Sequence, residues 1–590
     1  MTDLILWNST SSRRRSPTDD FLDNGLAILK AYVESRGFSV EVVDWANGVQ
    51  WDRMTPKLLA RLNRLIAARL LSGGGRNSNA GSFLRKILGA LFISTQDITS
   101  WLQKFNQKSL IAELARHVRD SGCRVLGIKT WYGETYLTAC HFAGILRRIA
   151  PEVLIVAGGP HASTYREAVL EDGLFDFAVV GEGESALVHM LEKARQCQTK
   201  AELTAAIIAS AENGSLENTI YRSNGAFRIS PRRKPVADDK VVPDYPPQPG
   251  KTRIHVIVES LGCPWDKCSF CTHARTYGGY SARRPEAVVD EIEQMVARGI
   301  GIFRYAGSST TLACARRIAR EIEKRGLNVI YSMFGRAEPR ASNPETYPEV
   351  VESFRLLIRS GFRSVFLGAE SGDDRINEQV MNKGVTRADI VATMRAMREA
   401  SRIEGIPIDV GISLIYPAPT LGLLSLEELL AADLSLVEET EPDSVLVSPP
   451  APFPGTTWFD QRDRFGFQLD ENFVNDMLSY DYVLYKPLFL WPEIGLRLEG
   501  NSLHRIFELC GSLRGEIERR GYVTEVTDVQ FLMLRAAGYR GREGVNEFKD
   551  KTQLSILSCD YRWINQLQEK VNLASLEQAR LNAAYQEAGI

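Results

Sequence analysis

Long apolar stretches, a strong excess of one charge and a signal peptide are all missing from this sequence of 590 residues. The longest apolar stretches, such as residues 87–93, fall well short of the roughly 20 residues that a spanning helix needs, so we expect no membrane span. The net charge of -2 gives no indication of nucleic-acid binding. Residues 1–7 lack a basic segment followed by an apolar core, so we expect a cytoplasmic protein.

Cysteine is also scarce, with nine residues in the whole chain. The odd total and the scattered positions argue against the disulfide framework of a secreted protein, so we expect a reducing compartment. A composition of 44% hydrophobic and 24% charged residues is that of an ordinary globular protein with two to four domains. Three cysteines nevertheless fall within nine residues of one another: Cys263, Cys268 and Cys271.

These three cysteines follow the apolar run 253–260 and therefore lie on a loop at the end of a predicted strand. A structural zinc site needs four ligands and usually shows a second pair of ligands about 12–20 residues further on. No such pair follows, and His273 is the only additional candidate nearby. Three thiolates on an iron–sulfur cube leave one iron open to an outside ligand. The residues favour a cluster, with structural zinc and unligated buried thiols as alternatives.

The first 200 residues alternate between buried strands and amphipathic helices, interrupted by a Leu-, Arg- and Lys-rich insertion at about 50–105 that reads as helices. Strands at 3–8, 38–45, 124–130, 153–157 and 175–180 predict a doubly wound parallel sheet, which binds ligands at the carboxyl ends of its strands. Residues at those ends are the candidate contacts: Asn8, Ser9, Thr130, Trp131, Tyr132, Gly158, Gly159, Pro160, His161, Gly181, Glu182 and Glu184.

A hairpin and a proline-rich linker occupy residues 201–252, after which six strand–helix units fill 253–456. Such units predict a partial barrel of the TIM type with its active site at the carboxyl ends of the strands. Residues 457–590 form a mainly helical region, for which a lid over the substrate pocket and a packing module are equally good interpretations. Candidate residues at the barrel strand ends are Gly307, Ser308, Arg336, Glu370 and Ser371.

The segment Cys268-Ser269-Phe270-Cys271 resembles the cluster motif of the radical S-adenosylmethionine (SAM) enzymes. It departs from that motif in the gap between the first two cysteines, which is four residues here and usually three. The resemblance implies a partial (β/α)6 barrel in which the three cysteines hold a 4Fe-4S cluster. It further implies that Phe270, Gly307, Ser308, Arg336, Glu370 and Ser371 contact SAM.

Upstream, the sequences Gly-Gly-Pro-His-Ala at 158–162 and Val-Val-Gly-Glu-Gly-Glu at 179–184 resemble the cobalamin-binding domain of one class of these enzymes. The Asp-x-His-x-x-Gly motif that supplies a cobalt ligand in many such domains is absent, because the segment from His141 to Gly144 lacks the aspartate. The resemblance implies a cobalamin-binding domain over about 1–200, in which the twelve strand-end residues named above contact the cofactor. A degenerate domain that binds no corrin is the alternative.

Together, the two resemblances imply a cobalamin-dependent radical SAM methyltransferase that acts on an unactivated carbon of a small-molecule or peptide natural product. Rearrangement or cyclisation, polar methyl transfer without an adenosyl radical, and a non-enzymatic metal-binding scaffold are the alternatives. The expected cofactors are a 4Fe-4S cluster, SAM and cobalamin. The expected partners are the substrate and an external electron donor of the flavodoxin or ferredoxin type, and we expect a monomer. Nothing in the residues selects one substrate.

Overall fold

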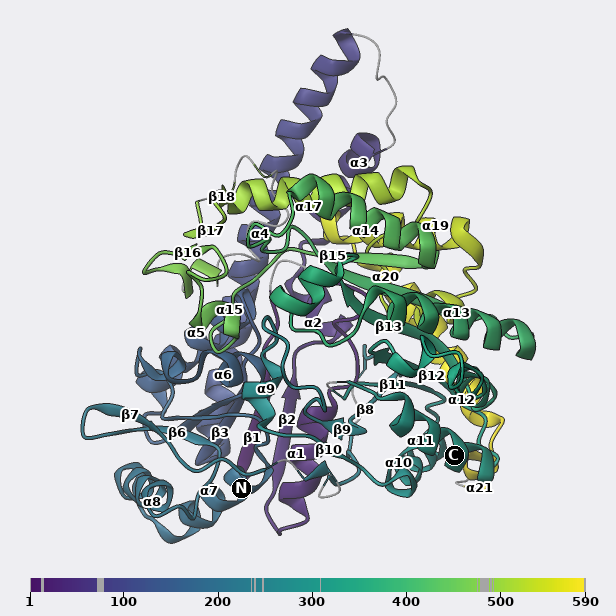
Figure 1. Cartoon of the computed structure of the whole chain (residues 1–590). Coiled ribbons are helices and arrows are strands. Elements are labelled where there is room, and N and C mark those ends of the chain that lie inside the picture. Colours follow the sequence, from purple (N-terminus) through teal and green to yellow (C-terminus); the bar gives the residue numbers. More distant parts are fainter. Residues whose placement is uncertain are drawn as a thin grey trace.

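Two parallel sheets lie side by side in the computed structural model, and helices cover both (Figure 1). The first sheet and its helices are purple to blue in that view, the second sheet and its outer helices are teal to green, and the last helices of the chain are yellow-green to yellow. Ser308, one of the predicted SAM contacts, falls outside the described residues. The structure describes residues 2–587 except 12–14, 72–78, 235, 238–239, 247–248, 308, 475, 478–487, 489–490 and 492.

The first sheet has the strand order β2-β1-β3-β4-β5-β6-β7. Its first five strands are parallel, and the hairpin formed by β6 and β7 extends the sheet by two antiparallel strands. The predicted doubly wound sheet is therefore present, and the predicted hairpin joins its edge instead of standing apart. The strands are β1 (Leu4–Asn8), β2 (Val40–Asp44), β3 (Val125–Lys129), β4 (Leu154–Gly158), β5 (Phe177–Val179), β6 (Thr219–Ser223) and β7 (Ala226–Ile229).

Helices cover both faces of this sheet because alternate strand residues are apolar on each side. Ile5 and Ile128 face α4 (Asn79–Ser121) and α5 (Glu134–Ile149), whereas Leu6 and Val156 face α1 (Asn24–Glu34) and α7 (Glu184–Gln196). The insertion consists of α2 (Gly48–Met54), α3 (Lys57–Leu71) and the first half of α4. Figure 1 shows this half of α4 projecting beyond the rest of the molecule.

The second sheet has six parallel strands in the sequential order β8-β11-β12-β13-β14-β15, so it is an open, partial barrel as predicted. Its strands are β8 (His255–Ile257), β11 (Ile302–Tyr305), β12 (Ile330–Gly335), β13 (Phe362–Glu370), β14 (Asp409–Ile415) and β15 (Ser444–Ser448). Its outer helices are α10 (Pro285–Ala297), α11 (Leu312–Lys324), α12 (Tyr347–Arg359), α13 (Arg387–Glu404) and α14 (Leu426–Thr440).

The last four helices contact the amino-terminal ends of the barrel strands. Gly301 N, just before β11, donates to Ser575 Oγ over 3.1 Å, and Asn328 N, before β12, donates to Asn582 Oδ1 over 2.6 Å. Arg535 pairs with Asp409, the first residue of β14. These helices therefore pack against the end of the barrel opposite the carboxyl ends of its strands, and a lid role for residues 457–527 stays a prediction. The four helices are α18 (Asp528–Ala536), α19 (Gly541–Ser558), α20 (Arg562–Arg580) and α21 (Ala583–Glu587).

The remaining elements lie in the loops and connections that precede or follow the strands of the two sheets. Among the described residues, no helix combines the length and the apolar character that crossing a bilayer requires. Short elements near the cysteine loop are β9 (Ser260–Leu261), β10 (Ser281–Ala282), α9 (His273–Tyr277) and α15 (Thr457–Asp460). Others are α6 (Pro160–Tyr165), α8 (Lys200–Glu212), β16 (Phe467–Leu469), β17 (Leu496–Leu498), β18 (Asn501–Ser502) and α17 (Leu503–Arg519).

Candidate functional site

An apolar cavity of about 230 Å³ lies at the carboxyl ends of the first sheet, between its strands and helices α1 and α7. Strand residues such as Leu6 and Val156 form its floor, and Leu187 of α7 forms a wall. Val258, Leu261 and Tyr277, which follow β8 of the second sheet, complete the lining. The cavity is thus shared by the first sheet and by the loop that carries the three cysteines.

Glycine supplies the space at the strand ends. A Cβ added to Gly158 would meet no atom within 4 Å, so the missing side chain leaves the cavity open at the end of β4. The next residue, Gly159, has a φ of +93°, and its backbone follows Thr130 so closely that a Cβ would lie 3.1 Å from the Thr130 carbonyl oxygen. A volume below that of most drug-sized ligand pockets suits one end of a larger ligand. These residues fit a bulky cofactor that inserts one part into the sheet edge.

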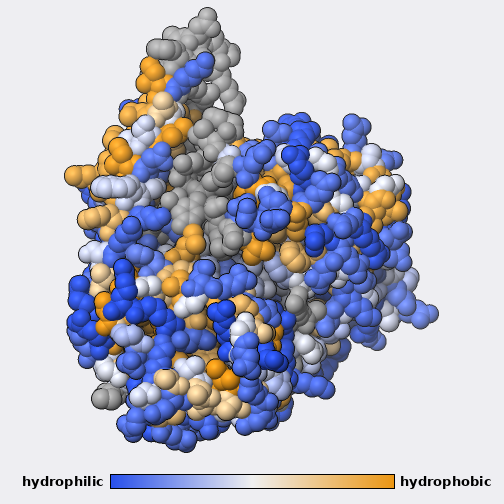
Figure 2. All heavy atoms as spheres, turned by 90° about the vertical axis from the view of Figure 1, so that its left-hand side faces the viewer, coloured by the Kyte–Doolittle hydropathy of each residue, from blue (hydrophilic) through white to orange (hydrophobic). Residues whose placement is uncertain are grey.

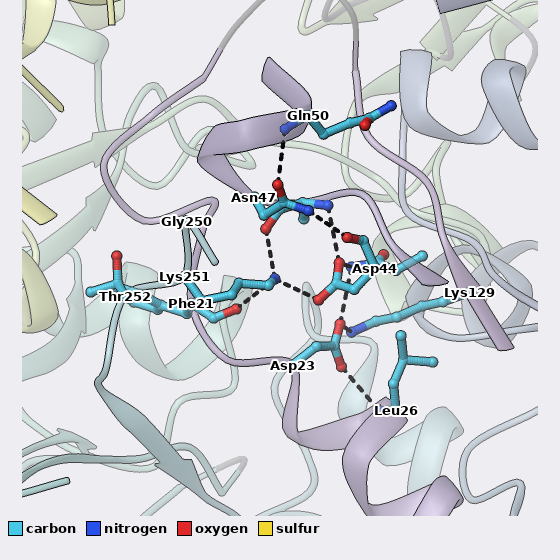
Figure 3. Close-up of polar contacts among 12 residues, drawn as sticks. Phe21, Asp23, Leu26, Asp44, Asn47, Gln50, Lys129, Gly250, Lys251 and Thr252 are labelled. Atoms are coloured by element: carbon cyan, nitrogen blue, oxygen red, sulfur yellow. Dashed lines mark hydrogen bonds and ion pairs between the residues drawn. The ribbon is translucent and has the colours of Figure 1, made fainter. Parts of the chain in front are cut away.

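A buried charge network supports the same edge (Figure 3). Lys129 at the end of β3 lines the cavity and pairs with Asp23, the residue that caps α1. Lys251 from the linker pairs with Asp44 at the end of β2 over 2.5 Å, and both side chains are 2% exposed. Asn8 donates to both carboxylates, over 3.2 Å to Asp23 and 2.8 Å to Asp44. The two lysine side chains balance the charge of the two aspartates, and these contacts hold the linker against the ends of β1, β2 and β3.

A second ion cluster closes the far side of the cavity. Lys240 of the linker pairs with both predicted residues of the Gly-Glu-Gly-Glu loop, at 2.7 Å from Glu182 Oε1 and with Glu184 as well. Burial lowers the pKa of Lys240, but the two carboxylates outweigh this effect and the net shift is upward. The linker that joins the two sheets therefore also contributes to the cavity wall.

The predicted cobalamin contacts divide into two groups. Gly158, Gly159, Gly181, Glu182 and Glu184 line the cavity. The remaining seven residues do not line it. Four of them form hydrogen bonds at the strand ends: Asn8 belongs to the charge network, the Ser9 hydroxyl donates to the Thr135 carbonyl oxygen, the Thr130 hydroxyl donates to the Gly158 carbonyl oxygen, and Trp131 donates to Asn8. Tyr132 is hydrogen-bonded to Thr164, Pro160 begins α6, and His161 lies in the core.

His161, a predicted cobalamin contact, lies in the core and does not line the cavity. Its ring is 2% exposed and is stacked between Tyr136, at a centroid distance of 3.7 Å, and Tyr165, at 4.4 Å. Burial lowers its pKa to about 3, so the ring is neutral. The chain begins α6 at Pro160, and this turns the His161 side chain into the core instead of toward the strand ends.

Trp131 and Tyr132 lie on the rim and are 40% and 39% exposed. The Tyr132 ring stacks on Phe453 of the barrel rim, with centroids 6.2 Å apart and planes inclined by 30°. This contact joins the loop after β3 to the loop after β15, so the catalytic ends of the two sheets face a common space.

The cysteine loop begins with a close backbone approach. Gly262 has a φ of +73°, and a Cβ there would lie 1.7 Å from the Gly279 carbonyl oxygen, so only glycine fits before Cys263. Cys268 and Cys271 line an open cavity of about 670 Å³ together with Asn382 and Gly455. Burial raises the pKa of the Cys268 thiol to about 11, although the Lys383 charge opposes the shift.

The three cysteine side chains are all partly exposed on this loop. Within the described residues, no three Cys, His, Asp or Glu side chains are grouped closely enough to hold one metal ion. An iron–sulfur cube holds its thiolates on separate irons, so it tolerates wider spacing than a single ion does. The loop fits a cube better than it fits a closed zinc site.

Glu370, the predicted SAM contact at the end of β13, pairs with Lys383. Lys383 Nζ lies 2.7 Å from Glu370 Oε1, and the two side chains are 10% and 9% exposed. The same ammonium lies 5.8 Å from the centroid of the Phe270 ring, between the last two cysteines. Arg336 donates to the Lys383 carbonyl oxygen and stacks 4.5 Å over Trp265 of the cysteine loop. The structure therefore gathers Phe270, Arg336 and Glu370 beside the cysteines.

The two other described SAM candidates have structural partners. Gly307 N donates over 2.8 Å to Glu259, a fully buried carboxylate that also accepts from Thr310. The Ser371 hydroxyl donates to Asp433 of α14 over 3.2 Å and is fully buried. Gly307 takes part through its backbone N–H, whereas the Ser371 side chain is directed toward Asp433 of α14.

Sequence reasoning missed Lys383, Lys129 and Glu259 as members of these sites. Glu259 carried a signal, because it is an acid in the last part of an apolar run directly before the cysteine loop. Lys129 likewise ends the apolar strand 125–129. Lys383 lies 13 residues after Glu370 along the chain, and no local pattern indicates their pairing.

Comparison with protein-family models identifies two domains. A model described as "B12 binding domain" matches residues 93–191, and one described as "Radical SAM superfamily" matches residues 257–413. The first covers three strands of the first sheet, and the second begins at the last residue of β8 and includes the cysteine loop.

Two solved structures share the fold over most of the chain. The radical SAM methyltransferase TsrM from Kitasatospora setae, with cobalamin and a 4Fe-4S cluster bound, is 18% identical with a TM-score of 0.51, covering 80% of this chain and 77% of TsrM. The cobalamin-dependent radical SAM enzyme OxsB is 13% identical with a TM-score of 0.55, covering 94% of this chain and 72% of OxsB. At such identities the likeness shows the fold alone.

Curated relatives match shorter segments. A tRNA-2-methylthio-N(6)-dimethylallyladenosine synthase of Geobacter sulfurreducens is 28% identical over 199 residues, which are 32% of this chain and 40% of the relative. The enzyme of the same name from Desulfosudis oleivorans is 26% identical over 186 residues, 30% of this chain and 36% of that relative. The chain thus spans well under half the length of these two relatives.

Proposed function

We propose that this chain, a cobalamin-dependent radical SAM enzyme that combines a B12-binding domain with a radical SAM domain, transfers a methyl group to an unactivated carbon of its substrate. Its cofactors are cobalamin, a 4Fe-4S cluster and SAM. We further propose that the substrate is a small molecule or a peptide, that an external flavodoxin- or ferredoxin-type protein supplies electrons, and that the enzyme is a monomer.

One observation carries the proposal. The loop after β8 borders two cavities at once, because Leu261 and Tyr277 line the apolar cavity of the first sheet while Cys268 and Cys271 line the open cavity of the barrel. Enzymes that use two cofactors in one reaction need them in a common, water-poor space. A single loop of 17 residues provides walls to both sites here.

The chain's own residues hold and orient the reactants. Cys263, Cys268 and Cys271 would each ligate one iron of the cluster and leave the fourth iron open. When bound, the reduced cluster supplies the electron that cleaves SAM, and cobalamin supplies the methyl group. The paired Glu370 and Lys383 present one carboxylate and one ammonium beside the cysteines, which suits the amino-acid end of SAM.

Aromatic side chains shield the reaction space from water. The Phe270 ring lies 5.7 Å from that of Trp458, and this pair covers the barrel side of the cysteine loop. Tyr132 stacked on Phe453 covers the rim between the two sheets. Excluding water protects a reactive radical from side reactions and strengthens charge interactions within the site.

Product analysis tests the proposal. Anaerobically reconstituted protein, supplied with hydroxocobalamin, SAM, reductant and an extract of small molecules, should form both S-adenosylhomocysteine and 5'-deoxyadenosine. 5'-Deoxyadenosine alone would indicate a rearrangement or cyclisation, and S-adenosylhomocysteine alone would indicate polar methyl transfer. Either single-product result would overturn radical methylation.

A further inference from the structure

Over residues 95–107, helix α4 exposes its apolar face and buries its polar face, which is the reverse of an ordinary surface helix. A helix at the surface of a globular protein normally buries its apolar stripe and exposes its polar face. Here Ile98, Trp101 and Phe105 are 50%, 65% and 61% exposed. The opposite, buried face consists of hydroxyl and amide side chains: Thr95, Gln96, Thr99, Ser100, Gln103 and Gln107.

Specific hydrogen bonds fix this orientation. Asn63 of α3 donates to Thr99 Oγ1 over 2.9 Å, and Gln107 donates to the Thr10 carbonyl oxygen over 3.0 Å. Gln96 donates to the Leu557 carbonyl oxygen of α19. Turning the apolar stripe inward would break these buried bonds, each of which is costly to leave unmade. The exposed stripe is therefore a fixed property of the fold.

The apolar stripe is long and continuous. On α4 it runs through Ile87, Leu91, Ile98, Trp101 and Phe105, with spacings of three, four or seven residues that keep them on one side of the helix. The rings of Trp101 and Phe105 are stacked, with centroids 6.0 Å apart. In Figure 2, apolar residues form a band along the upper part of the molecule, where Figure 1 shows α4 projecting.

Helix α3, which packs against α4, also exposes apolar side chains. We call the two helices the arm and define it as the described residues of 57–108. Leu58, Leu62 and Leu65 of α3 are 81%, 42% and 58% exposed. Eight of the sixteen large hydrophobic side chains that are exposed among the described residues belong to the arm. Such concentration marks an interaction surface and is not the scattered exposure of an ordinary surface.

The charge of the arm has one sign. The described residues of 57–108 contain eight lysine and arginine residues and one acidic residue, whereas the whole chain has a net charge of -2. Lys57 and Arg61 of α3 and Lys86 of α4 are exposed on the two helices that carry these apolar side chains. Exposed leucine, tryptophan and phenylalanine flanked by basic residues are the pattern of helices that lie in the interface of an anionic membrane.

We propose that the arm docks on an anionic lipid surface, with the stripe from Ile87 to Phe105 in the acyl-chain boundary and the flanking lysine and arginine side chains at the headgroups. A second copy of the chain fits less well, because pairing two arms would bring like charges together. This proposal goes beyond the methyl transfer proposed above and does not depend on it.

Vesicle flotation of the full-length protein tests the proposal without SAM, cobalamin or substrate. We expect binding to phosphatidylcholine vesicles that contain phosphatidylglycerol, at least about tenfold weaker binding to phosphatidylcholine alone, and loss of binding in high salt. The variant W101S/F105S should lose binding, whereas L573S/L581S, which removes side chains that are 60% and 62% exposed outside the arm, should bind as the wild type does. The charge reversal K57E/R61E/K86E should also lose binding.

Three outcomes would overturn the proposal. The first is no binding to anionic vesicles, and the second is equal binding by the wild type and W101S/F105S. The third is a concentration-dependent dimer, detected by light scattering, that W101S/F105S abolishes, because this would assign the stripe to an interface between copies. Circular dichroism of the variants checks that a loss of binding does not come from unfolding.

Discussion

Lys383 Nζ lies 2.7 Å from Glu370 Oε1 in a buried ion pair at the mouth of the barrel, beside the cysteine loop. Glu370 is the last residue of β13 and has a φ of +65°, which is unfavourable for a residue with a side chain. A Cβ on Gly368 would lie within 2.7 Å of atoms of both partners, so the pair needs glycine at that position. Such local strain held by tight packing is typical of functional sites.

The first prediction concerns this pair. K383M leaves the Glu370 carboxylate buried with the Ser413 hydroxyl, at 3.3 Å, as its remaining hydrogen-bond donor among the described residues, and should cost about 3–5 kcal/mol of unfolding free energy. The double variant E370Q/K383M should recover most of that loss, because no lone charge stays buried. Both E370Q and the double variant should bind SAM about 10- to 100-fold more weakly in equilibrium dialysis. Unchanged SAM affinity in E370Q would remove Glu370 from the SAM site.

The second prediction concerns the cluster ligands. C263A, C268A and C271A should each abolish the brown iron–sulfur absorbance of anaerobically reconstituted protein, because a cube that has lost one of three thiolates is poorly held. C140A and C197A are matched controls, since these cysteines are also partly exposed but lie outside the cysteine loop, on α5 and at the end of α7. A full cluster surviving in all three loop variants would remove the motif from the account.

The third prediction concerns the apolar cavity. G158V should fill the open end of β4 and reduce the cobalamin that the protein retains on gel filtration, while the iron content stays unchanged. G511V is the control, because a Cβ at Gly511 of α17 also meets no atom within 4 Å. Retention of cobalamin by G158V at the wild-type level would place the cofactor elsewhere.

The fourth prediction concerns pH. Asp433 is fully buried, accepts from Gly372 N over 2.6 Å, and has one carboxylate oxygen without a partner among the described residues. Burial raises its pKa from 3.8 to about 7. Because the folded-state pKa exceeds the unfolded value, the folded protein binds more protons in this window, and stability falls as the pH rises through it.

Asp433→Asn removes this titration and keeps the oxygen that accepts from Gly372. Between about pH 5 and pH 8, the wild type should lose roughly 2 kcal/mol more of unfolding free energy than the variant does. Urea denaturation at several pH values measures the difference. Identical pH dependence in the two proteins would mean that Asp433 is ionised throughout the range.

The sequence predicted the two parallel sheets and the position of the cysteine loop because these follow from local alternation and spacing. It also predicted Gly158, Gly159 and Gly181 at strand ends, and these residues line the cavity, whereas their contact with cobalamin stays a prediction. A strand determines on which edge of the sheet its last residues lie, so such predictions need no knowledge of distant contacts.

The directions of side chains were less predictable. His161 follows a strand, but it belongs to the first turn of α6 and packs between two tyrosines. The pairs formed by Lys383 with Glu370 and by Lys251 with Asp44 join separate elements, and no local pattern indicates them. The inverted face of α4 was hidden because its apolar periodicity is that of any amphipathic helix.

Magnetic interaction between the two cofactors tests the central claim that the sites share one space. In protein loaded with cob(II)alamin, reducing the cluster should speed the spin relaxation of cob(II)alamin, as measured by microwave power saturation in electron paramagnetic resonance. The C263A/C268A/C271A variant should show no such change. Identical cob(II)alamin relaxation with the cluster oxidised and reduced in the wild type would contradict the account.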